Sequence, residues 1–300
     1  MSFLNPVNEP VLRFSSTDAG APQINYNART AGDVKAVLKA CLVTGYGATA
    51  SAGWAVVNEV GDVCEFVSPS AAMSDYRLKI TDSTATNTTW EYCYQDTLTN
   101  PTYNTPIKAL MFANKTHANN GWQMLVTERG LVFIELVQHS VVNKLSARIT
   151  YWGAVKSAVP SVTGKNICFF NLGHNAGISY PNYLYSPNIY THVQLDGYAA
   201  AQMSAAINYS ASQGFTLGMS NVDLVSSIYL TPNTQATVIG ELPVMLSKII
   251  NSASDIYGIS EFALGGRNVL SVCAGYAATP DNQAYIYSRT FLIRTDYWEY

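Results

Sequence analysis

The stretch from Gly45 to Trp54 has the composition of a loop that could bind a phosphate. Its sequence, GYGATASAGW, combines three glycines with several small side chains. A phosphate loop precedes a helix, because the free N–H groups and the positive end of the helix dipole face the anion. This stretch instead follows a segment that we predict to be helical, and it lacks the lysine of a G-x-x-x-x-G-K-[ST] loop. The order of elements favours a helix stop and a tight crossing into the next strand.

Histidine is the next residue type that could do chemistry. His174 lies in the segment NLGHNAG, and His192 lies close to Asp196. A histidine beside an aspartate can act as a general base, but no nucleophile motif of the form G-x-S-x-G accompanies either one. The acidic residues show no spacing that pairs them as acid and base. We therefore expect no catalytic residues and a protein that is not an enzyme.

The cysteines show no pattern of a metal site or a disulfide framework. They are odd in number, widely spaced and without a C-x-x-C pair: Cys41, Cys64, Cys93, Cys168 and Cys273. Most of them lie in apolar segments, which is typical of buried, reduced thiols. We expect all five to be free and non-catalytic, and we expect neither a metal nor another cofactor.

The composition limits the class of protein. Charged residues make up 12% of the 300 residues and hydrophobic residues 48%, with 20 tyrosines and a net charge of −3. This low-charge, tyrosine-rich profile favours a β-rich protein with large contact surfaces, and it excludes a disordered chain. No cluster of Lys and Arg predicts nucleic-acid binding, and no apolar run is long enough to span a membrane. The first residues also show no pattern of a secretion signal.

One amphipathic helix is predicted over residues 31–44. Its apolar residues recur at helical spacing: Val34, Val37, Leu38, Cys41 and Leu42. Thr30 and Asp33 form a candidate capping pair, and Gly45 is a candidate for the residue after the helix. After Trp54 the period changes to two, which predicts short strands separated by turns. Residues 145–152 fit a strand or a helix, and residues 198–207 have a helical composition.

These elements predict a mainly β protein with one or two α-helices, an α+β fold. We expect antiparallel sheets or a sandwich, with the N-terminal amphipathic helix packed on a sheet. Trp54 should be buried where the first strand of the sheet begins. The chain divides into an N-terminal α+β domain, 1–155, and a β-rich C-terminal domain, 156–300, unless the two form one continuous fold.

Two motifs beside the helix resemble a known family. The sequence STDAGAP over 16–22 precedes the helix, and GYGATASAGW over 45–54 follows it. They resemble the start of a family of virion structural proteins from tailed bacteriophages and prophages, whose members carry S-T-D-x-G-A-P and G-Y-G-x-x-x-x-x-G-W at these places. Weaker matches follow in the same order: YRLKITD, TERGLVFIEL, ATVIGELPVML and GGRNVLSVCAG. The chain departs from the pattern in its long 173–215 region and at Val244, where the family has glycine.

The resemblance implies a non-enzymatic structural component of a tailed bacteriophage virion, in the tail, baseplate or neck. Such a protein is made in the cytoplasm of the bacterial host and becomes part of the virion. Its partners would be copies of itself and other virion proteins, with contact to the host surface and with no nucleic acid or membrane span. The alternatives are a receptor-binding or carbohydrate-binding module at the tail tip, a capsid decoration protein, and a hydrolase of cell-surface glycans.

The segment 174–190 is the candidate interface for such partners. It is long, uncharged and rich in tyrosine and proline, a composition that is costly to expose to water. Tyrosine is enriched at the core of protein–protein interfaces, whereas Lys, Glu and Asp are depleted there. We therefore predict that four tyrosines lose solvent exposure in the assembled particle: Tyr180, Tyr183, Tyr185 and Tyr190.

Overall fold

The fold is described here from a computed structural model of the whole chain. The structure describes residues 7–24, 30–74, 76–84, 87–94, 102–103, 107–110, 121–138, 145–157, 167–172, 190–195, 198–202, 204–205, 224–231, 240–249, 259–274 and 289–300. Within 87–110 and 167–231 the description covers the backbone only.

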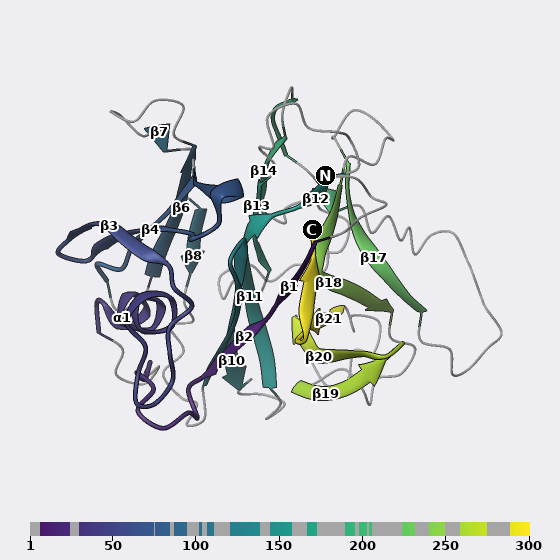
Figure 1. Cartoon of the computed structure of the whole chain (residues 1–300), viewed down its shortest axis with the longest axis horizontal. Helices are drawn as coiled ribbons and strands as arrows, with labels where there is room; N and C mark the ends of the chain where they lie inside the picture. The colour runs from purple at the N-terminus through teal and green to yellow at the C-terminus, as the bar shows by residue number, and fades with distance from the viewer. Residues whose placement is uncertain are drawn as a thin grey trace, which may run out of the picture.

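Three antiparallel sheets form three layers (Figure 1). The first sheet, beside the helix, has the strand order β3 (Ala55–Val60), β4 (Val63–Val67), β5 (Tyr76–Thr81), β6 (Asn87–Tyr94) and β7 (Thr102–Tyr103), and β8 (Ile107–Leu110) also pairs with β6. The central sheet has the order β15 (Tyr198–Gln202), β14 (Tyr190–Leu195), β13 (Ile167–Leu172), β11 (Leu145–Ala154), β10 (Gly130–Gln138), β9 (Trp122–Thr127) and β2 (Leu12–Ser15).

The third sheet comes mostly from the C-terminal part of the chain. Its order is β16 (Ser204–Ala205), β17 (Leu224–Thr231), β18 (Gly240–Ile249), β21 (Arg289–Arg294), β20 (Arg267–Ala274) and β19 (Ile259–Leu264), and β12 (Lys156–Ser157) also pairs with β18. The two ends of the described chain pair with each other as β1 (Asn8–Pro10) and β22 (Tyr297–Glu299). The expected mainly β, antiparallel fold is therefore confirmed.

The predicted helix forms as two consecutive pieces. The α-helix α1 spans Asp33–Lys39 and continues into a π-helical turn over Ala40–Thr44. All five apolar residues that predicted the helix are fully buried in the main hydrophobic cluster, as the 3.6-residue period requires. That the helix packs on a sheet stays a prediction.

The start of the helix is capped from a distant strand. The predicted pair is in contact, because the Asp33 side chain accepts hydrogen bonds from the Thr30 N–H (2.9 Å) and hydroxyl (2.7 Å), but Thr30 lies two residues before the N-cap. The N-cap itself is Gly32, which has no side chain to cap the first turn. Asp82, at the end of β5, takes that role and accepts from the N–H groups of Val34 (2.8 Å) and Lys35 (3.2 Å). The helix thus begins where a neighbouring strand supplies the carboxylate.

One segment with a helical composition and one that fits either a strand or a helix both form strands. The helical composition of 198–207 was misleading, because 198–202 forms β15 against β14 and 204–205 forms β16 against β17. The ambiguous segment 145–152 lies within β11, which pairs along its length with β10. Helix propensity is a weak determinant of structure, and strand pairing across the chain overrides it in both places.

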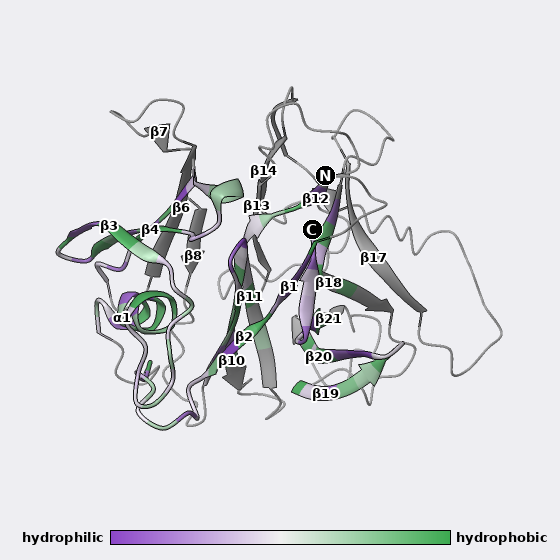
Figure 2. Cartoon of the chain, viewed as in Figure 1, coloured by the Kyte–Doolittle hydropathy of each residue, from purple (hydrophilic) through white to green (hydrophobic). Residues whose placement is uncertain are grey.

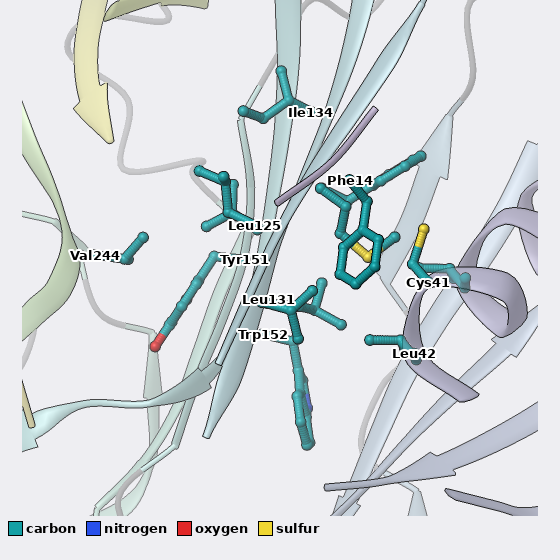
Figure 3. Close-up of a cluster of buried hydrophobic side chains, with 14 of the residues drawn as sticks. Phe14, Cys41, Leu42, Leu125, Leu131, Ile134, Tyr151, Trp152 and Val244 are labelled. Atoms are coloured by element: carbon teal, nitrogen blue, oxygen red, sulfur yellow. The ribbon is translucent and has the colours of Figure 1, made fainter. Parts of the chain in front are cut away.

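The central sheet is buried on both faces where β9, β10 and β11 meet. Every residue from Gly130 to Glu135 of β10 is buried, as expected for a strand covered on both sides. The register places Leu131 beside Trp152 and Val132 beside Tyr151, so alternate residues face opposite layers. Figure 3 shows these two faces, with Cys41 and Leu42 of the helix on one side and Val244 of β18 on the other.

The predicted division of the chain after residue 155 stays a prediction. The central sheet has strands on both sides of that position, because β11 pairs with β10 and also with β13. One hydrophobic cluster includes the helix, the central sheet and residues of β18, β20 and β21.

Candidate functional site

The four tyrosines predicted as an interface are not tested by the structure. Tyr180, Tyr183 and Tyr185 lie outside the described residues, and Tyr190 is the first residue of β14, where the description covers the backbone only. His192 lies in the same strand, and His174 lies outside the described residues. The candidate sites that the structure does describe are a joint beside the helix and a clasp at the chain ends.

The two motifs that flank the helix come together in one place. We call residues Ser16–Pro22 and Gly45–Trp54 the N-terminal joint. Asp18 lies at its centre, where its carboxylate accepts hydrogen bonds from the Ser15 N–H (2.8 Å) and from the Tyr46 hydroxyl (2.6 Å). The Tyr46 ring packs near Phe14 of β2, with 6.1 Å between ring centroids, and edge-on to Trp122 of β9. The aspartate of one motif therefore holds the tyrosine of the other.

The backbones of the two motifs nearly touch. Gly47 has a φ of +54°, and a Cβ at this position would lie 2.4 Å from the carbonyl oxygen of Ala19. A Cβ on Gly20 would in turn lie 3.2 Å from the Cα of Gly47. Glycine is needed here for both the left-handed conformation and the close approach. The glycines of the two motifs thus serve the contact between them.

The N–H groups of the glycine-rich loop are used inside the protein. Those of Ala52 and Trp54 donate to the carbonyls of Cys41 and Leu42, at 2.9 Å each, and so satisfy the last turn of the helix. Those of Tyr46 and Thr49 exchange hydrogen bonds with each other's carbonyls within the loop. These groups are therefore not available to a phosphate, which agrees with the helix-stop interpretation.

Trp54 ties the joint to the central sheet. Its side chain is buried, as predicted, and its indole N–H donates to the carbonyl of Thr127 at the end of β9 (3.2 Å). Its ring lies 5.3 Å from that of Trp152 in β11, in a tilted arrangement that aromatic pairs favour. β3 then begins at Ala55, directly after this anchor.

Burial raises the pKa values of one tyrosine and two cysteines in and around the joint. Burial raises the pKa of Tyr46, and the hydrogen bond to Asp18 adds to the rise. Burial likewise raises the pKa of the Cys41 thiol, and it raises that of Cys64 to about 11. Both cysteines are free and buried, as predicted for these two. A thiol with a raised pKa is a poor nucleophile, so neither cysteine has the environment of a catalytic one.

The second candidate site fastens the two ends of the chain together. We call β1, β22 and their ion pairs the terminal clasp. Val7 and Tyr300 exchange two backbone hydrogen bonds of 3.0 Å, and the Tyr300 hydroxyl lies 2.9 Å from that of Thr127. The Glu9 carboxylate lies 2.6 Å from the Arg129 guanidinium. Burial raises the pKa of Glu9, although Arg129 opposes this.

Arg267 is the centre of the charged part of the clasp. It donates to Asp296 (3.1 Å), to Glu299 (2.6 Å) and to the backbone carbonyl of Tyr297 (2.6 Å). Burial, the largest single influence, raises the pKa of both carboxyl groups. The hydrogen bonds from Arg267, backbone N–H groups beside Asp296 and the positive charges around Glu299 together outweigh it, so each pKa lies below its ordinary value. The guanidinium also lies 3.3 Å from the centre of the Tyr297 ring, a cation–π contact.

Glycine allows the clasp to lie close to the central sheet. Gly130 of β10 and Gly153 of β11 are cross-strand partners. A Cβ on Gly153 would lie 2.6 Å from the Gly130 Cα and 2.9 Å from the Tyr151 hydroxyl, and one on Gly130 would lie 3.4 Å from the Tyr300 hydroxyl. A larger residue at Gly153 would therefore collide with the facing backbone and with Tyr151, whereas a Cβ on Gly130 would come into contact with the C-terminal tyrosine.

Neither site has the geometry of a catalytic centre. Among the described residues no group of three or more His, Cys, Asp or Glu side chains could hold a metal ion. The pairs described above, such as Asp18 with Tyr46 and Arg267 with Asp296, hold segments of the chain in place. Within the same residues no helix is both long and apolar enough to cross a membrane.

Comparisons of the chain with protein-family models, with curated proteins and with solved structures found no match.

Sequence reasoning found the joint but not the clasp. The motifs of the joint stand beside the helix and carry glycine and tryptophan signals that can be recognised locally. Arg267 begins β20, Glu299 ends β22 and Asp296 lies just before β22, and no spacing in the sequence relates Arg267 to the two acidic residues. The segment DYWEY over 296–300 has two acidic residues among aromatic ones. This is the signal that could have indicated an arginine partner.

Proposed function

We propose that this protein is a non-enzymatic structural component of a tailed bacteriophage virion, of the tail, the baseplate or the neck. The observation that carries the proposal is the N-terminal joint. The residues that resemble the virion family are those that the joint uses: Asp18, Gly20, Gly47 and Trp54. The resemblance therefore lies in residues that hold the fold together.

The polar groups of the joint support a structural role. A site that acts on a ligand directs some polar groups toward the place that the ligand occupies. In the joint, the Asp18 carboxylate binds the Tyr46 hydroxyl, and the N–H groups of Ala52 and Trp54 bind the last turn of the helix. This arrangement fits a part whose function is its shape and its contacts with neighbours.

The surface supports a role in assembly. With 12% charged residues, the chain has few strongly solvated side chains to cover a surface of 14437 Å². Large hydrophobic residues lie exposed on strands at the edges of all three sheets: Leu12 on β2, Val57 and Val60 on β3, and Phe262 on β19. Specific protein interfaces bury about 1,200–2,000 Å² in total, so contacts with partners would cover a substantial part of this surface.

A protein inventory of purified phage particles by mass spectrometry tests the proposal. The protein should be present in multiple copies and should stay with the particles through a density gradient and a high-salt wash. The matched control is a phage in which the gene is deleted, and its particles should show a structural defect by electron microscopy that the wild-type gene restores. Absence of the protein from intact particles would overturn the proposal.

Hydrogen exchange on free and assembled protein then tests the tyrosine-rich segment. Peptides from 174–190 should exchange more slowly in the particle, because an interface excludes water from them. Peptides from α1 serve as the control, since Val34, Val37 and Leu38 are already buried in the single chain. Equal exchange of 174–190 in both states would reject this segment as an interface. Binding to a glycan array would favour the tail-tip module, and release of sugar from cell-surface glycans would favour the hydrolase.

A further inference from the structure

The outer strand of the third sheet, β19, presents an open edge. It pairs with β20 on one side, and no other described strand pairs with it. Residues Ser260 to Ala263 are all exposed, so neither face of the strand is covered there by described residues. Phe262 is 39% exposed, and Figure 2 shows hydrophobic residues along this strand. A long, regular edge of this kind is a template for pairing with another strand.

The backbone groups that point outward from β19 follow from its hairpin with β20. Asn268 of β20 faces Ala263, and its C=O accepts from Thr295 while its N–H donates to Asp296. Both groups of Asn268 thus point away from β19, so Ala263 and Asn268 are a non-hydrogen-bonded pair. The N–H and C=O of Ala263 therefore point to the open edge. The alternation of an antiparallel ladder extends this to Glu261 and Ile259.

The exposed outer strand of the first sheet, β3, is protected against such pairing. Its register with β4 shifts between Val56 and Asn58, which marks a bulge at Val57. Glu59 of β3 forms ion pairs with Lys35 and Lys39, so the strand carries charged side chains and lies beside the helix. Bulges and charges are the devices by which proteins keep edge strands from pairing. By contrast, β19 keeps one register from end to end.

The single charge on β19 is already neutralised. Arg13 of β2 binds both carboxylate oxygens of Glu261, through its two terminal nitrogens. If two copies of β19 pair antiparallel about Glu261, the contact gathers two carboxylates and two guanidinium groups with no net charge. The like charges that would otherwise oppose each other across the two strands are thus balanced.

We propose that β19 is an interface between two copies of this chain, paired antiparallel about a two-fold axis at Glu261. The inference deepens the proposed assembly role by naming the partner and the surface. In this register Ile259 of each copy faces Ala263 of the other, and the outward N–H and C=O groups make about six hydrogen bonds across the axis. The two Phe262 side chains lie diagonally across the axis on the same face, within reach of each other.

Mixed disulfide formation tests the partner and the register together. Facing residues of a hydrogen-bonded antiparallel pair have Cα atoms about 5.5 Å apart, which suits a disulfide. Under mild oxidation, Ile259→Cys protein mixed with Ala263→Cys protein should give a covalent dimer. Each variant alone should not, because equal residues would lie roughly 13 Å apart along the strands. Wild-type protein controls for the native cysteines. A mixture that gives no more dimer than either variant alone would overturn the proposal.

A single proline substitution at the edge tests the pairing without a covalent cross-link. Ala263→Pro removes an outward N–H and leaves the ladder with β20 intact, because that N–H is not part of it. Sedimentation over a concentration series should show wild-type dimers and at least a tenfold weaker association for Ala263→Pro. Val60→Lys, on the protected strand β3, is the matched control and should associate like the wild type. Circular dichroism spectra and melting temperatures establish that each variant is folded.

The outcomes separate this inference from the proposed function. A wild-type protein that stays monomeric, or an Ala263→Pro variant that associates like the wild type, overturns the β19 interface even if the protein is found in particles. Protection of β19 in particles without any self-association assigns the edge to another virion protein and likewise overturns it. Mixed dimers from a protein that is absent from particles would support the interface and reject the virion role.

Discussion

The N-terminal joint and the terminal clasp fasten different parts of the chain to the same central sheet by different means. The joint uses neutral hydrogen bonds, ring packing and close backbone contact around Trp54 and Gly47. The Asp18 carboxylate takes part by accepting hydrogen bonds from an N–H and a hydroxyl. The clasp uses ion pairs, Glu9 with Arg129 and Arg267 with Asp296 and Glu299.

This difference predicts which region should lose stability when the pH, a side-chain volume or a charge is changed. Packing and backbone hydrogen bonds change little with pH, whereas a carboxylate loses its ion pair when it is protonated. The joint should therefore respond to changes of side-chain volume, and the clasp to changes of charge. The five predictions below test this contrast, from the largest expected effect to the smallest.

Val37→Asp should have the largest effect on the helix side of the molecule. Val37 is completely buried, and a carboxylate placed there has no partner that was built for it. We expect a loss of more than about 4 kcal/mol in the free energy of unfolding, with loss of the native near-UV circular dichroism. Val60→Asp, at a position that is 69% exposed, is the control and should leave stability nearly unchanged. An unchanged melting temperature in Val37→Asp would refute the helix assignment.

Trp54→Ala should cost roughly 3–5 kcal/mol, as is usual for a buried tryptophan. The change removes the ring contact with Trp152 and the hydrogen bond to Thr127. Trp54→Phe keeps an aromatic ring and loses the hydrogen bond, so it should cost less than Trp54→Ala. Urea unfolding followed by circular dichroism measures both. Quenching of Trp54 fluorescence by a water-soluble quencher in the native protein would contradict the burial.

Arg267→Met should destabilise the clasp by about 1.5–3 kcal/mol at pH 7, the range for hydrogen bonds to charged groups. The pKa values of Asp296 and Glu299 are lowered in the folded protein, so their contribution is present above their unfolded pKa values of about 4. That contribution is lost as the pH falls through the folded pKa values. The difference between Arg267→Met and wild type should therefore shrink in melts at pH 3.

The raised pKa of Glu9 has the opposite sign and must be separated from this effect. Its contribution is greatest below the unfolded pKa and is lost as the pH rises through the folded pKa. Glu9 is common to the wild type and the variant, so it cancels in their difference. A difference between Arg267→Met and wild type that stays constant from pH 7 to pH 3 would count against the ion-pair account of the clasp.

Gly47→Ala should cost about 1–2 kcal/mol more than Gly61→Ala. The two glycines have nearly the same φ, +54° and +56°, so the backbone strain of an alanine is matched. A Cβ at Gly47 would collide with the Ala19 carbonyl, whereas a Cβ at Gly61 meets nothing within 4 Å. The difference between the two variants in urea unfolding isolates the contact between the motifs. Equal costs would mean that the close approach is not important.

The thiols should show the smallest effect. We expect five free thiols under denaturing conditions, and no reaction of Cys41 or Cys64 in the native protein at pH 8, because both are buried with raised pKa values. A disulfide or a bound metal would contradict the assignment of free thiols.

Labelling of Cys41 also tests whether the joint and the clasp open independently. If they do, Arg267→Met at pH 7 should leave the reaction rate of Cys41 unchanged. Faster labelling of Cys41 in that variant would mean that the two regions open together.

Some of this structure could be predicted from the sequence because it depends on neighbours along the chain. The spacing of Val34, Val37 and Leu38 determines a helix with one buried face. Gly265 and Gly266 supply the two positive φ angles of the turn between β19 and β20, which the sequence marks as a turn. The burial of Trp54 and the free state of Cys41 and Cys64 were also predicted correctly.

Tertiary structure alone decided the rest, because the partners are far apart in the chain. Asp82 caps a helix that begins at Asp33, Arg267 meets Asp296 and Glu299, and no periodicity relates such pairs. Residues 198–202 have the composition of a helix but form a strand, because pairing with β14 satisfies their backbone. A short segment has only a weak preference of its own, and the free energy that chooses its form comes from hydrogen bonds and burial against distant strands.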